Sequence, residues 1–401
     1  MTQDPRTDLD RQVGEWLRDE STIKAPDRVV EGVFAATTRS RQVHRWWPPA
    51  LSTQPMERRL RMPVALAAIT IVAVAAFAAT RLFTVTGVGV QATPVASPTP
   101  SPTALAPLPS PRATTLDGLS AQVVRLGADA GPIDVVGAFG SIWVANIHSN
   151  DVSRLDGTTL AQQARVPAGT GPAWFATTET GVWVTNQLGA GLALIDPATN
   201  SAVATVGDGR PCGSPVVAFG DLWASACDSH EMLRIDLAAF KDMKTGLRYP
   251  STDQFYTKIP ALGYRWLALV DGRLITGSRT TLAEIDPATN EITDLGICCG
   301  DVMASDGQAV WLNRGSDIAR MDLQGKVLAT FPYPGGQTSV TFVDGRAWLG
   351  VGGVGAVEVD LATNEVLRTI RLPGSTLLAR EVDGMLWVTN FDTSDLWRID
   401  V

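Results

Sequence analysis

The chain has 401 residues and a formal net charge of −8, and this charge is unevenly distributed. Residues 1–61 contain eleven Lys or Arg and nine Asp or Glu, so they carry +2 and leave −10 for residues 62–401. An acidic main part argues against nucleic acid as a partner, because phosphate binding needs clustered Lys and Arg. The chain is also too long for one compact domain of ordinary size.

The first segment, residues 1–61, is polar and contains two short amphipathic patterns. An apolar stripe at helical spacing starts at Leu9, and a second one starts near Pro26. Two short helices of this kind cannot enclose a sizeable core. Two interpretations stay open, a solvated or membrane-lying cytoplasmic tail and a docking segment for a cytoplasmic regulator.

Residues 62–84 are predicted to form a transmembrane helix. The uncharged stretch at 63–80 reads PVALAAITIVAVAAFAAT and is just long enough to span a bilayer. A signal peptide fits poorly, because about sixty residues precede this stretch. Three Arg lie at 58, 59 and 61, whereas no Lys or Arg occurs between Arg81 and Arg112. The positive-inside rule therefore predicts a single-pass plasma-membrane protein with a cytoplasmic N-terminus and an extracytoplasmic C-terminal part.

Residues 85–119 are expected to be a linker. Within them, residues 92–112 read ATPVASPTPSPTALAPLPSPR and contain few large apolar side chains. Such a composition cannot build a packed core. Pro-rich chains extend by about 3 Å per residue, so this linker would hold the following domain away from the membrane.

Residues 120–401 repeat one phrase seven times. The phrase places a Trp within an apolar strand and then an Asp after an apolar pair, often followed by P-A-T-N. The Trp slots are assigned to Trp143, Trp183, Trp223, Leu274, Trp311, Trp348 and Trp387. The Asp slots are Asp156, Asp196, Asp236, Asp286, Asp322, Asp360 and Asp400. A period of about forty residues built from short strands and turns predicts a mainly β fold, a seven-bladed β-propeller with one blade per repeat.

The two ends of the repeat region predict how the ring closes. The last repeat stops after its third strand, at Asp400, and residues 121–127 resemble an outer strand with no blade before it. We expect these N-terminal residues to complete the last blade, which leaves no open sheet edge. The loops between second and third strands then share a rim with the crossings between blades. We expect this rim to be accessible to ligands and the linker to enter at the opposite rim, beside the C-terminus.

The phrases that carry a family resemblance are GSIWVAN, GVWVTNQ, LIDPATN and LWVTN. They resemble the YVTN-type repeats and the virginiamycin B (streptogramin B) lyase-like propellers over the whole repeat region. The resemblance implies the seven-bladed fold. For the lyases it also implies ring opening of streptogramin by elimination, with two His, Glu and magnesium. Because no His follows His230, this chain lacks that constellation, and we do not expect lyase activity.

The remaining two His of the repeat region define a candidate site. His148 and His230 fall in loops of the rim that we expect to be accessible, and acid–base or metal chemistry would need carboxylates beside them. The polar neighbours are Asn150, Asp151, Asp228 and Glu231. Polar loop residues are more often solvated than catalytic. No catalytic or metal-binding residue is therefore assigned, and magnesium enters only under the lyase alternative.

An insertion in the fourth unit adds two candidate binding aromatics, Tyr249 and Tyr256. Insertions on a repeat scaffold often carry binding, although a self-packed loop is the alternative. Four Cys are expected to meet an oxidising compartment. A disulfide is predicted between Cys212 and Cys227, whose loops share a rim and a blade. For the adjacent Cys298 and Cys299, a vicinal disulfide and two thiols both stay open.

These observations favour a binding module over an enzyme. The expected protein is a membrane-anchored extracytoplasmic propeller that binds a protein, a glycan or a small ligand, as a sensor or a scaffold. Its expected partners are the cell membrane, that external ligand and a cytoplasmic regulator on the tail, with no cofactor. The alternative is a metal-dependent enzyme similar to the streptogramin lyases.

Overall fold

The computed structural model describes residues 108–401 apart from 242–252, 333–337 and 375. The predicted tail, the predicted transmembrane helix at 62–84 and most of the linker therefore lie outside the described residues. In the part that is described, none of the helices has the length and apolar character needed to cross a membrane.

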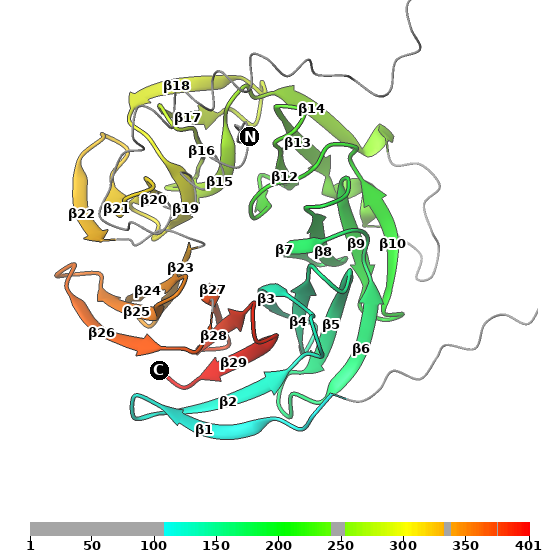
Figure 1. The fold of residues 1–401 in the computed structure, drawn as a ribbon. Coiled ribbons are helices and arrows are strands. Elements are labelled where there is room, and N and C mark those ends of the chain that lie inside the picture. Colours follow the sequence, from blue (N-terminus) through cyan, green and yellow to red (C-terminus); the bar gives the residue numbers. More distant parts are fainter. Residues whose placement is uncertain (1–107, 242–252, 333–337, 375) are drawn as a thin grey trace, which may run out of the picture. The chain divides into compact units, whose positions relative to one another are not determined.

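The described residues form seven β-sheets around a central axis, and each sheet is one blade of a β-propeller (Figure 1). The innermost strands are β3 (Pro132–Ala138), β7 (Pro172–Thr178), β11 (Val216–Ala218), β15 (Arg265–Val270), β19 (Asp301–Ser305), β23 (Thr338–Val343) and β27 (Thr376–Val382). The second strands are β4 (Ser141–Asn146), β8 (Gly181–Asn186), β12 (Asp221–Ala226), β16 (Arg273–Gly277), β20 (Val310–Asn313), β24 (Arg346–Val351) and β28 (Met385–Asn390).

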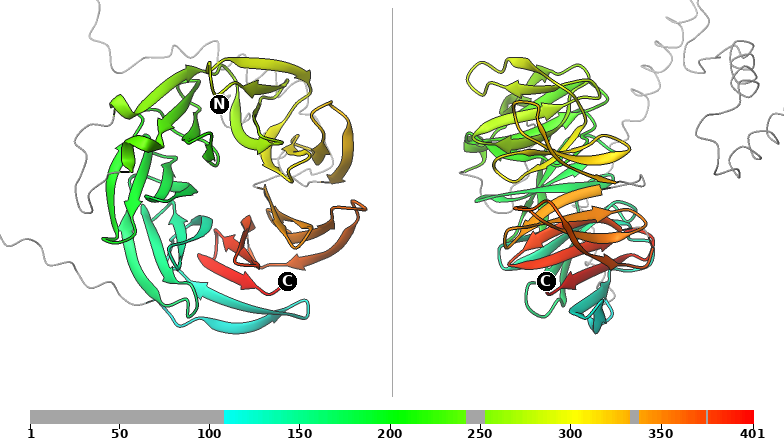
Figure 2. Two further views of the ribbon diagram at one scale, coloured as in Figure 1. Left: turned by 180° about the vertical axis from the view of Figure 1, so that it is seen from behind. Right: turned by 90° about the vertical axis from the view of Figure 1, so that its left-hand side faces the viewer.

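Two further strands complete each blade, and Figure 2 shows the same ring from behind and edge-on. The third strands are β5 (Asp151–Asp156), β9 (Leu192–Asp196), β13 (Glu231–Asp236), β17 (Leu282–Ile285), β21 (Asp317–Met321), β25 (Gly355–Asp360) and β29 (Asp395–Ile399). The outer strands are β6 (Gln162–Pro167), β10 (Ser201–Val206), β14 (Tyr256–Pro260), β18 (Ile292–Ile297), β22 (Val327–Pro332), β26 (Val366–Arg371) and β2 (Leu119–Arg125).

The predicted ring closure is confirmed. β2 pairs antiparallel with β29, with Ala121 opposite Ile399 and Arg125 opposite Asp395. One strand was not expected, since β1 (Arg112–Leu116) falls within the predicted linker and adds a fifth strand to this sheet. Because β1 reverses the direction of the chain, Arg112 lies opposite Val123. The chain therefore approaches the ring from near the Arg125 end of β2, and our expectation that it enters beside the C-terminus is wrong.

The Trp slots form the blade cores, with one correction. The six slot Trp are each at most 2% exposed, and burying such a side chain stabilises the fold by about 2–3 kcal/mol. In blade four the slot residue is Ile275 and not Leu274, because Ile275 lies opposite Glu284 as Trp143 lies opposite Arg154. Neighbouring residues of a strand face opposite sides, so Leu274 packs with the core cluster of the preceding blade.

The Asp slots and the P-A-T-N tetrads form the turns between third and fourth strands. Asp196 Oδ1 accepts a hydrogen bond from the backbone N–H of Ala198 at 2.8 Å. Asp286 and Asp360 each accept the corresponding hydrogen bond from the backbone N–H of the residue two positions later. The backbone N–H of Ala288 and the Thr289 hydroxyl hold the pKa of Asp286 below its ordinary value. The tetrads end in Asn200, Asn290 and Asn364, whose φ angles are 55°, 63° and 60°. These Asn residues therefore adopt the left-handed conformation, which Asn tolerates in turns.

The inserted residues lie in blade three, between β13 and β14, and not in blade four. A unit measured from one Trp slot to the next contains the third and fourth strands of the preceding blade, so an insertion in the fourth such unit falls in blade three. The described part of the insertion consists of η1 (Leu237–Phe240) and η2 (Asp253–Phe255). Phe240 is fully buried and meets Trp183 edge-on at 5.2 Å. This part of the insertion is therefore packed against the ring.

Candidate functional site

The inner strands enclose a pocket of about 230 Å³ on the central axis. We call it the central pocket, and its polar and aromatic lining comes from six blades. These residues are Trp174, Ser214, Trp266, Asp301, Asn313, Thr338, Ser339 and Arg380. Several of them stand at the first positions of inner strands, as Asp301 does in β19 and Thr338 in β23. The pocket therefore opens on the crossover rim, which is the rim formed by the blade crossings and the loops between second and third strands.

β-Bulges place side chains in the central pocket. The pairing register skips Trp174 in β7, Trp266 in β15 and Leu378 in β27. Hydroxyl groups of second strands hold two of these bulges. Thr185 Oγ1 accepts a hydrogen bond from the backbone N–H of Trp174 at 2.9 Å, and Ser225 Oγ accepts one from the backbone N–H of Trp266 at 3.1 Å. Bulges of this kind commonly re-aim side chains toward a site.

Arg380 is fixed by a buried carboxylate at one side of the central pocket. Arg380 Nε donates to Asp134 Oδ1 at 2.7 Å, and Nη2 donates to Ser214 Oγ at 3.0 Å. Asp134 is only 2% exposed, and its Oδ2 also accepts from the Phe175 backbone N–H at 3.2 Å. The guanidinium is thus held in one position, as recognition of a ligand requires.

Asp301 brings a carboxyl group to the opposite side of the central pocket. Burial raises its pKa above the ordinary value, while Arg265, Arg279 and the Trp266 indole partly oppose this rise. The indole Nε1 of Trp266 is itself buried and has no hydrogen-bond partner among the described residues. The Trp266 indole and the Asp301 carboxyl are thus near each other at the wall of the central pocket.

Two aromatic rings complete the wall of the central pocket. Trp174 and Trp266 meet edge-on, with their centroids 5.6 Å apart. Trp266 can occupy this place because residue 213 is glycine with φ +91°, and a Cβ there would lie 2.2 Å from Cε3 of the indole. The central pocket therefore offers aromatic faces, a fixed cation, an indole donor and a carboxyl group. Among the described residues of its lining, no nucleophile has an adjacent base.

The structure separates the two candidate His residues, which lie in different blades. His148 Nδ1 lies 2.8 Å from Asp129 Oδ1, and its ring meets Phe391 edge-on at 4.6 Å where blades one and seven join. His230 is exposed in the β12–β13 loop and has a left-handed φ of 56°. Within the described residues no group of three His, Cys, Asp or Glu is placed to hold a metal ion.

The polar neighbours of the two His have partners in the scaffold. Asp228 Oδ1 accepts from the Arg210 N–H at 2.8 Å, and Glu231 lies 3.4 Å from Lys258 Nζ. In blade one, Asn150 Oδ1 accepts from the Gly171 N–H at 2.8 Å and Asp151 pairs with Arg165. These contacts tie loops and crossings of the crossover rim together.

Of the two candidate Tyr residues, the structure describes Tyr256. Tyr256 packs on the core cluster around Trp183 and Phe240, and burial raises the pKa of its hydroxyl. Tyr249 lies outside the described residues. Tyr256 is not among the described residues that line the central pocket.

All four Cys form disulfides. The predicted Cys212–Cys227 disulfide is confirmed, and Cys298 and Cys299 form a vicinal disulfide. Both pairs lie on the crossover rim, next to residues of the central pocket.

The central pocket was missed by the sequence analysis, although one signal was present. Trp174 and Trp266 are Trp residues outside the repeat slots, and both lie near the start of an inner strand. A large aromatic side chain that breaks the repeat, together with a charged residue such as Arg380 in an innermost strand, indicates a site on the axis. The approach of these residues depends on bulges, which the apolar alternation does not reveal.

The comparisons with known proteins agree with the architecture. No family model matches the sequence, and no curated protein matches it. Among solved structures, virginiamycin B lyase from Staphylococcus aureus is 15% identical, with a TM-score of 0.56 over 70% of this chain and 99% of that one. Hydrazine synthase from Kuenenia stuttgartiensis is 14% identical, with a TM-score of 0.53 over 67% and 95%. The structural neighbours thus include virginiamycin B lyase-like seven-bladed propellers, and at these identities the likeness shows the fold alone.

Proposed function

We propose that this protein is a membrane-anchored extracytoplasmic propeller that binds a small ligand in the central pocket. The observation that carries the proposal is the convergence of bulged Trp174 and Trp266 with Arg380 and Asp301 at one end of the axis. Aromatic faces beside polar groups held in fixed positions are features of small-ligand sites, and here about half of the lining residues are polar.

The polar groups define the chemistry of the ligand. An acceptor on the ligand would bond to the unpartnered Trp266 Nε1, and a hydroxyl or amide donor would bond to Asp301. An apolar ring face would lie against Trp174. A monosaccharide unit of a glycan combines these features, and the volume of about 230 Å³ suits a single ring.

The apolar segment at 62–84 and the two disulfides support the proposed location. An uncharged stretch after three Arg fits a single-pass anchor, and disulfides persist outside the cytoplasm. In this arrangement the external ligand binds without a metal or another cofactor, and the tail remains in the cytoplasm for a regulator. The lyase alternative is less favoured, because His148 and His230 lie in different blades, and Asp228 and Glu231 contact the Arg210 N–H and Lys258.

Thermal-shift measurements on the full-length protein in detergent test this proposal. The panel contains hexoses, N-acetylhexosamines, amino acids, and streptogramin B with and without magnesium. We expect a concentration-dependent rise in Tm with a sugar, since a ligand of the folded state stabilises it. Magnesium-dependent opening of streptogramin B would instead support the lyase alternative.

Two Trp variants locate the binding. Trp266→Phe removes the unpartnered N–H, and we expect it to weaken binding at least about tenfold, the loss of one hydrogen bond. Trp397→Phe is the matched control, because Trp397 Nε1 is also buried without a partner but does not line the central pocket. Equal weakening by both variants would contradict binding in this pocket.

A further inference from the structure

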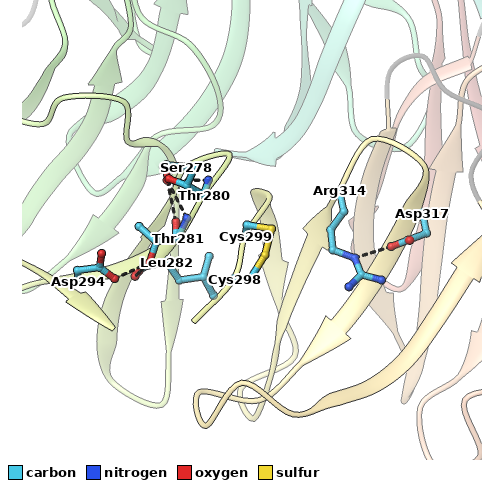
Figure 3. Close-up of a disulfide and its surroundings, with 9 residues drawn as sticks. All are labelled: Ser278, Thr280, Thr281, Leu282, Asp294, Cys298, Cys299, Arg314 and Asp317. Carbon is cyan, nitrogen blue, oxygen red and sulfur yellow. Dashed lines mark hydrogen bonds and ion pairs between the residues drawn. A yellow bond between two sulfur atoms is a disulfide. The ribbon is translucent and has the colours of Figure 1, made fainter. Parts of the chain in front are cut away.

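Two disulfides flank the central pocket, and they differ in what they join. Cys212–Cys227 has a sequence separation of 15 and ties the crossing into blade three to the β12–β13 loop. Cys298–Cys299 has a separation of 1 and joins neighbours within the crossing into blade five (Figure 3). In each crossing the residue two positions further on lines the pocket, Ser214 in one and Asp301 in the other.

The separations imply different roles. In the chain-entropy account, a disulfide that closes a loop of about 15 residues stabilises a fold by about 3 kcal/mol. A pair of adjacent residues closes no loop of this kind and restricts the unfolded chain little. Cys298–Cys299 therefore acts on the conformation of its own crossing and not as a staple of the fold.

The vicinal disulfide is accessible to reagents. Cys298 is exposed and Cys299 is half-buried in the β18–β19 crossing. Exposed disulfides are the ones that exchange with external thiols, whereas enclosed structural ones resist reduction.

The crossing is in close contact with the central pocket. Figure 3 shows the disulfide between the loop that carries Ser278 and the loop that carries Arg314. Gly300 N–H donates to the Ser278 carbonyl at 2.9 Å, and a Cβ at Gly300 would lie 2.9 Å from the Asn313 carbonyl oxygen. Asn313 and Asp301 both line the pocket, so any change in the backbone at 298–300 moves or loosens its polar wall.

We propose that Cys298–Cys299 is a thiol–disulfide exchange site for an extracytoplasmic dithiol, and that its reduction rearranges the Asp301 edge of the central pocket. One thiolate of the dithiol attacks Cys298 Sγ, the Cys298–Cys299 bond breaks, and Cys299 leaves as a thiolate that takes up a proton. The second thiol of the reductant then attacks the mixed disulfide and releases Cys298 as a thiol. The dithiol is oxidised to a disulfide, and the protein gains two electrons and two protons.

Differential alkylation of the full-length protein tests the exchange. The native protein is incubated with graded dithiothreitol, alkylated with iodoacetamide and mapped by peptide mass spectrometry. We expect Cys298 and Cys299 to be labelled at a dithiothreitol concentration at least tenfold below that for Cys212 and Cys227. Simultaneous labelling of all four Cys, or labelling of Cys212 and Cys227 first, overturns the proposal.

Hydrogen exchange tests the coupling to the pocket and needs no ligand. We expect reduction to speed amide exchange in the peptide covering 300–305 and to leave the peptide covering 214–218 unchanged. The double variant Cys298→Ser with Cys299→Ser should show the fast exchange without reductant, whereas Cys212→Ser with Cys227→Ser should still respond to reduction. Unchanged exchange at 300–305 after reduction would overturn the coupling.

A consequence for ligand affinity rests on the proposed function and is measured separately. If a sugar raises the Tm of the oxidised protein, reduction should weaken its binding at least threefold. Exchange and amide protection that behave as expected, with no sugar binding in either state, would count against the proposed function and leave the redox site standing. Equal affinity in both states would overturn the coupling.

Discussion

Junctions between neighbouring blades are of two kinds, those with an arginine latch and those without one. In the latched junctions, Nη1 of an Arg on the third strand of one blade donates to the Asn side chain of the hairpin turn in the next blade. Blades one and two join through Arg154 and Asn200 at 2.8 Å, and blades three and four through Arg234 and Asn290 at 2.7 Å. Blades five and six join through Arg320 and Asn364 at 2.9 Å.

The junctions after blades two, four and six lack the Arg, whereas blade seven has Arg398 opposite Trp387 but is followed by blade one, whose turn contains no P-A-T-N tetrad. The third-strand slot opposite Trp or Ile275 holds Leu194 in blade two, Glu284 in blade four and Glu358 in blade six. The turns of blades three and five, which follow blades two and four, contain no P-A-T-N tetrad. Arg thus occupies the slot in blades one, three, five and seven and the tetrads lie in blades two, four and six, so the alternation is interrupted where blade seven meets blade one. A turn signal that seems local in the sequence is one half of a contact between blades.

The largest effect is expected at the most buried latch. Arg320→Ala should lower the free energy of unfolding by about 3 kcal/mol, because it leaves the Asp306 carboxylate buried without its ion pair. The Arg320 and Asp306 side chains are 11% and 4% exposed and meet at 2.7 Å. Denaturant unfolding of the full-length protein measures the change. Arg154→Ala should cost less, since Arg154 Nε donates to the uncharged Ser141 hydroxyl; equal losses would contradict this ranking.

The next effect separates the latch from the turn. Asn364→Gly keeps the left-handed conformation and removes the acceptor of a charged donor, so it should cost about 1.5 kcal/mol. Asn364→Ala should cost about 1 kcal/mol more, because alanine is strained at a φ of 60°. Thermal unfolding of both variants provides the comparison. If Asn364→Gly left the Tm unchanged, the Asn364 side chain would stabilise only the turn and not the contact between the blades.

Acid should weaken the latch between blades five and six through Asp306. Burial raises the pKa of this carboxyl, but hydrogen bonds from Trp311 Nε1, the backbone at Gln308 and Arg320 outweigh burial and hold the pKa below the ordinary value of 3.8. A lowered folded-state pKa contributes stability above pH 3.8 that is lost as the pH falls through the folded value. Asp306→Asn should therefore be less stable at pH 7 and lose less stability on acidification. Parallel plots of Tm against pH for the two proteins would contradict this expectation.

The smallest loss of stability is expected in blade four, which has no latch Arg. Glu284 occupies the third-strand position opposite Ile275 in this blade. Its carboxylate pairs with Arg273 of the same blade at 2.6 Å, and the two side chains are about one-third exposed. Arg273 lowers the pKa of Glu284, yet solvent screens an exposed pair, so Glu284→Gln should cost no more than about 0.5 kcal/mol. This loss should shrink further in high salt. A cost comparable to that of Arg320→Ala would remove the distinction between the two kinds of junction.

Features that repeat along the sequence could be predicted, and features that join different repeats could not. The Trp and Asp slots and the tetrads predict the blades, their turns and the closing strand, because each depends on residues within one strand or turn. Ile275 shows the limit, since an apolar slot without Trp allows a register error of one residue. The latches join residues 44–56 positions apart, and the central pocket joins residues of six blades. The latch Arg residues and the tetrads recur in every second blade, but the sequence does not show which of them contact each other, and the bulges leave no periodic signal.

The closing sheet also sets an order of events during synthesis of the chain. Arg125 in β2 and its partner Asp395 in β29 are 270 residues apart, so β29 is made long after β2. At ordinary elongation rates the two are separated by an interval on the order of tens of seconds. Throughout that interval the β1–β2 hairpin has an unpaired edge beside growing blades with unpaired edges of their own. A chaperone or the translocation machinery that shields this hairpin would therefore improve the yield of folded protein more than one that acts on any later blade.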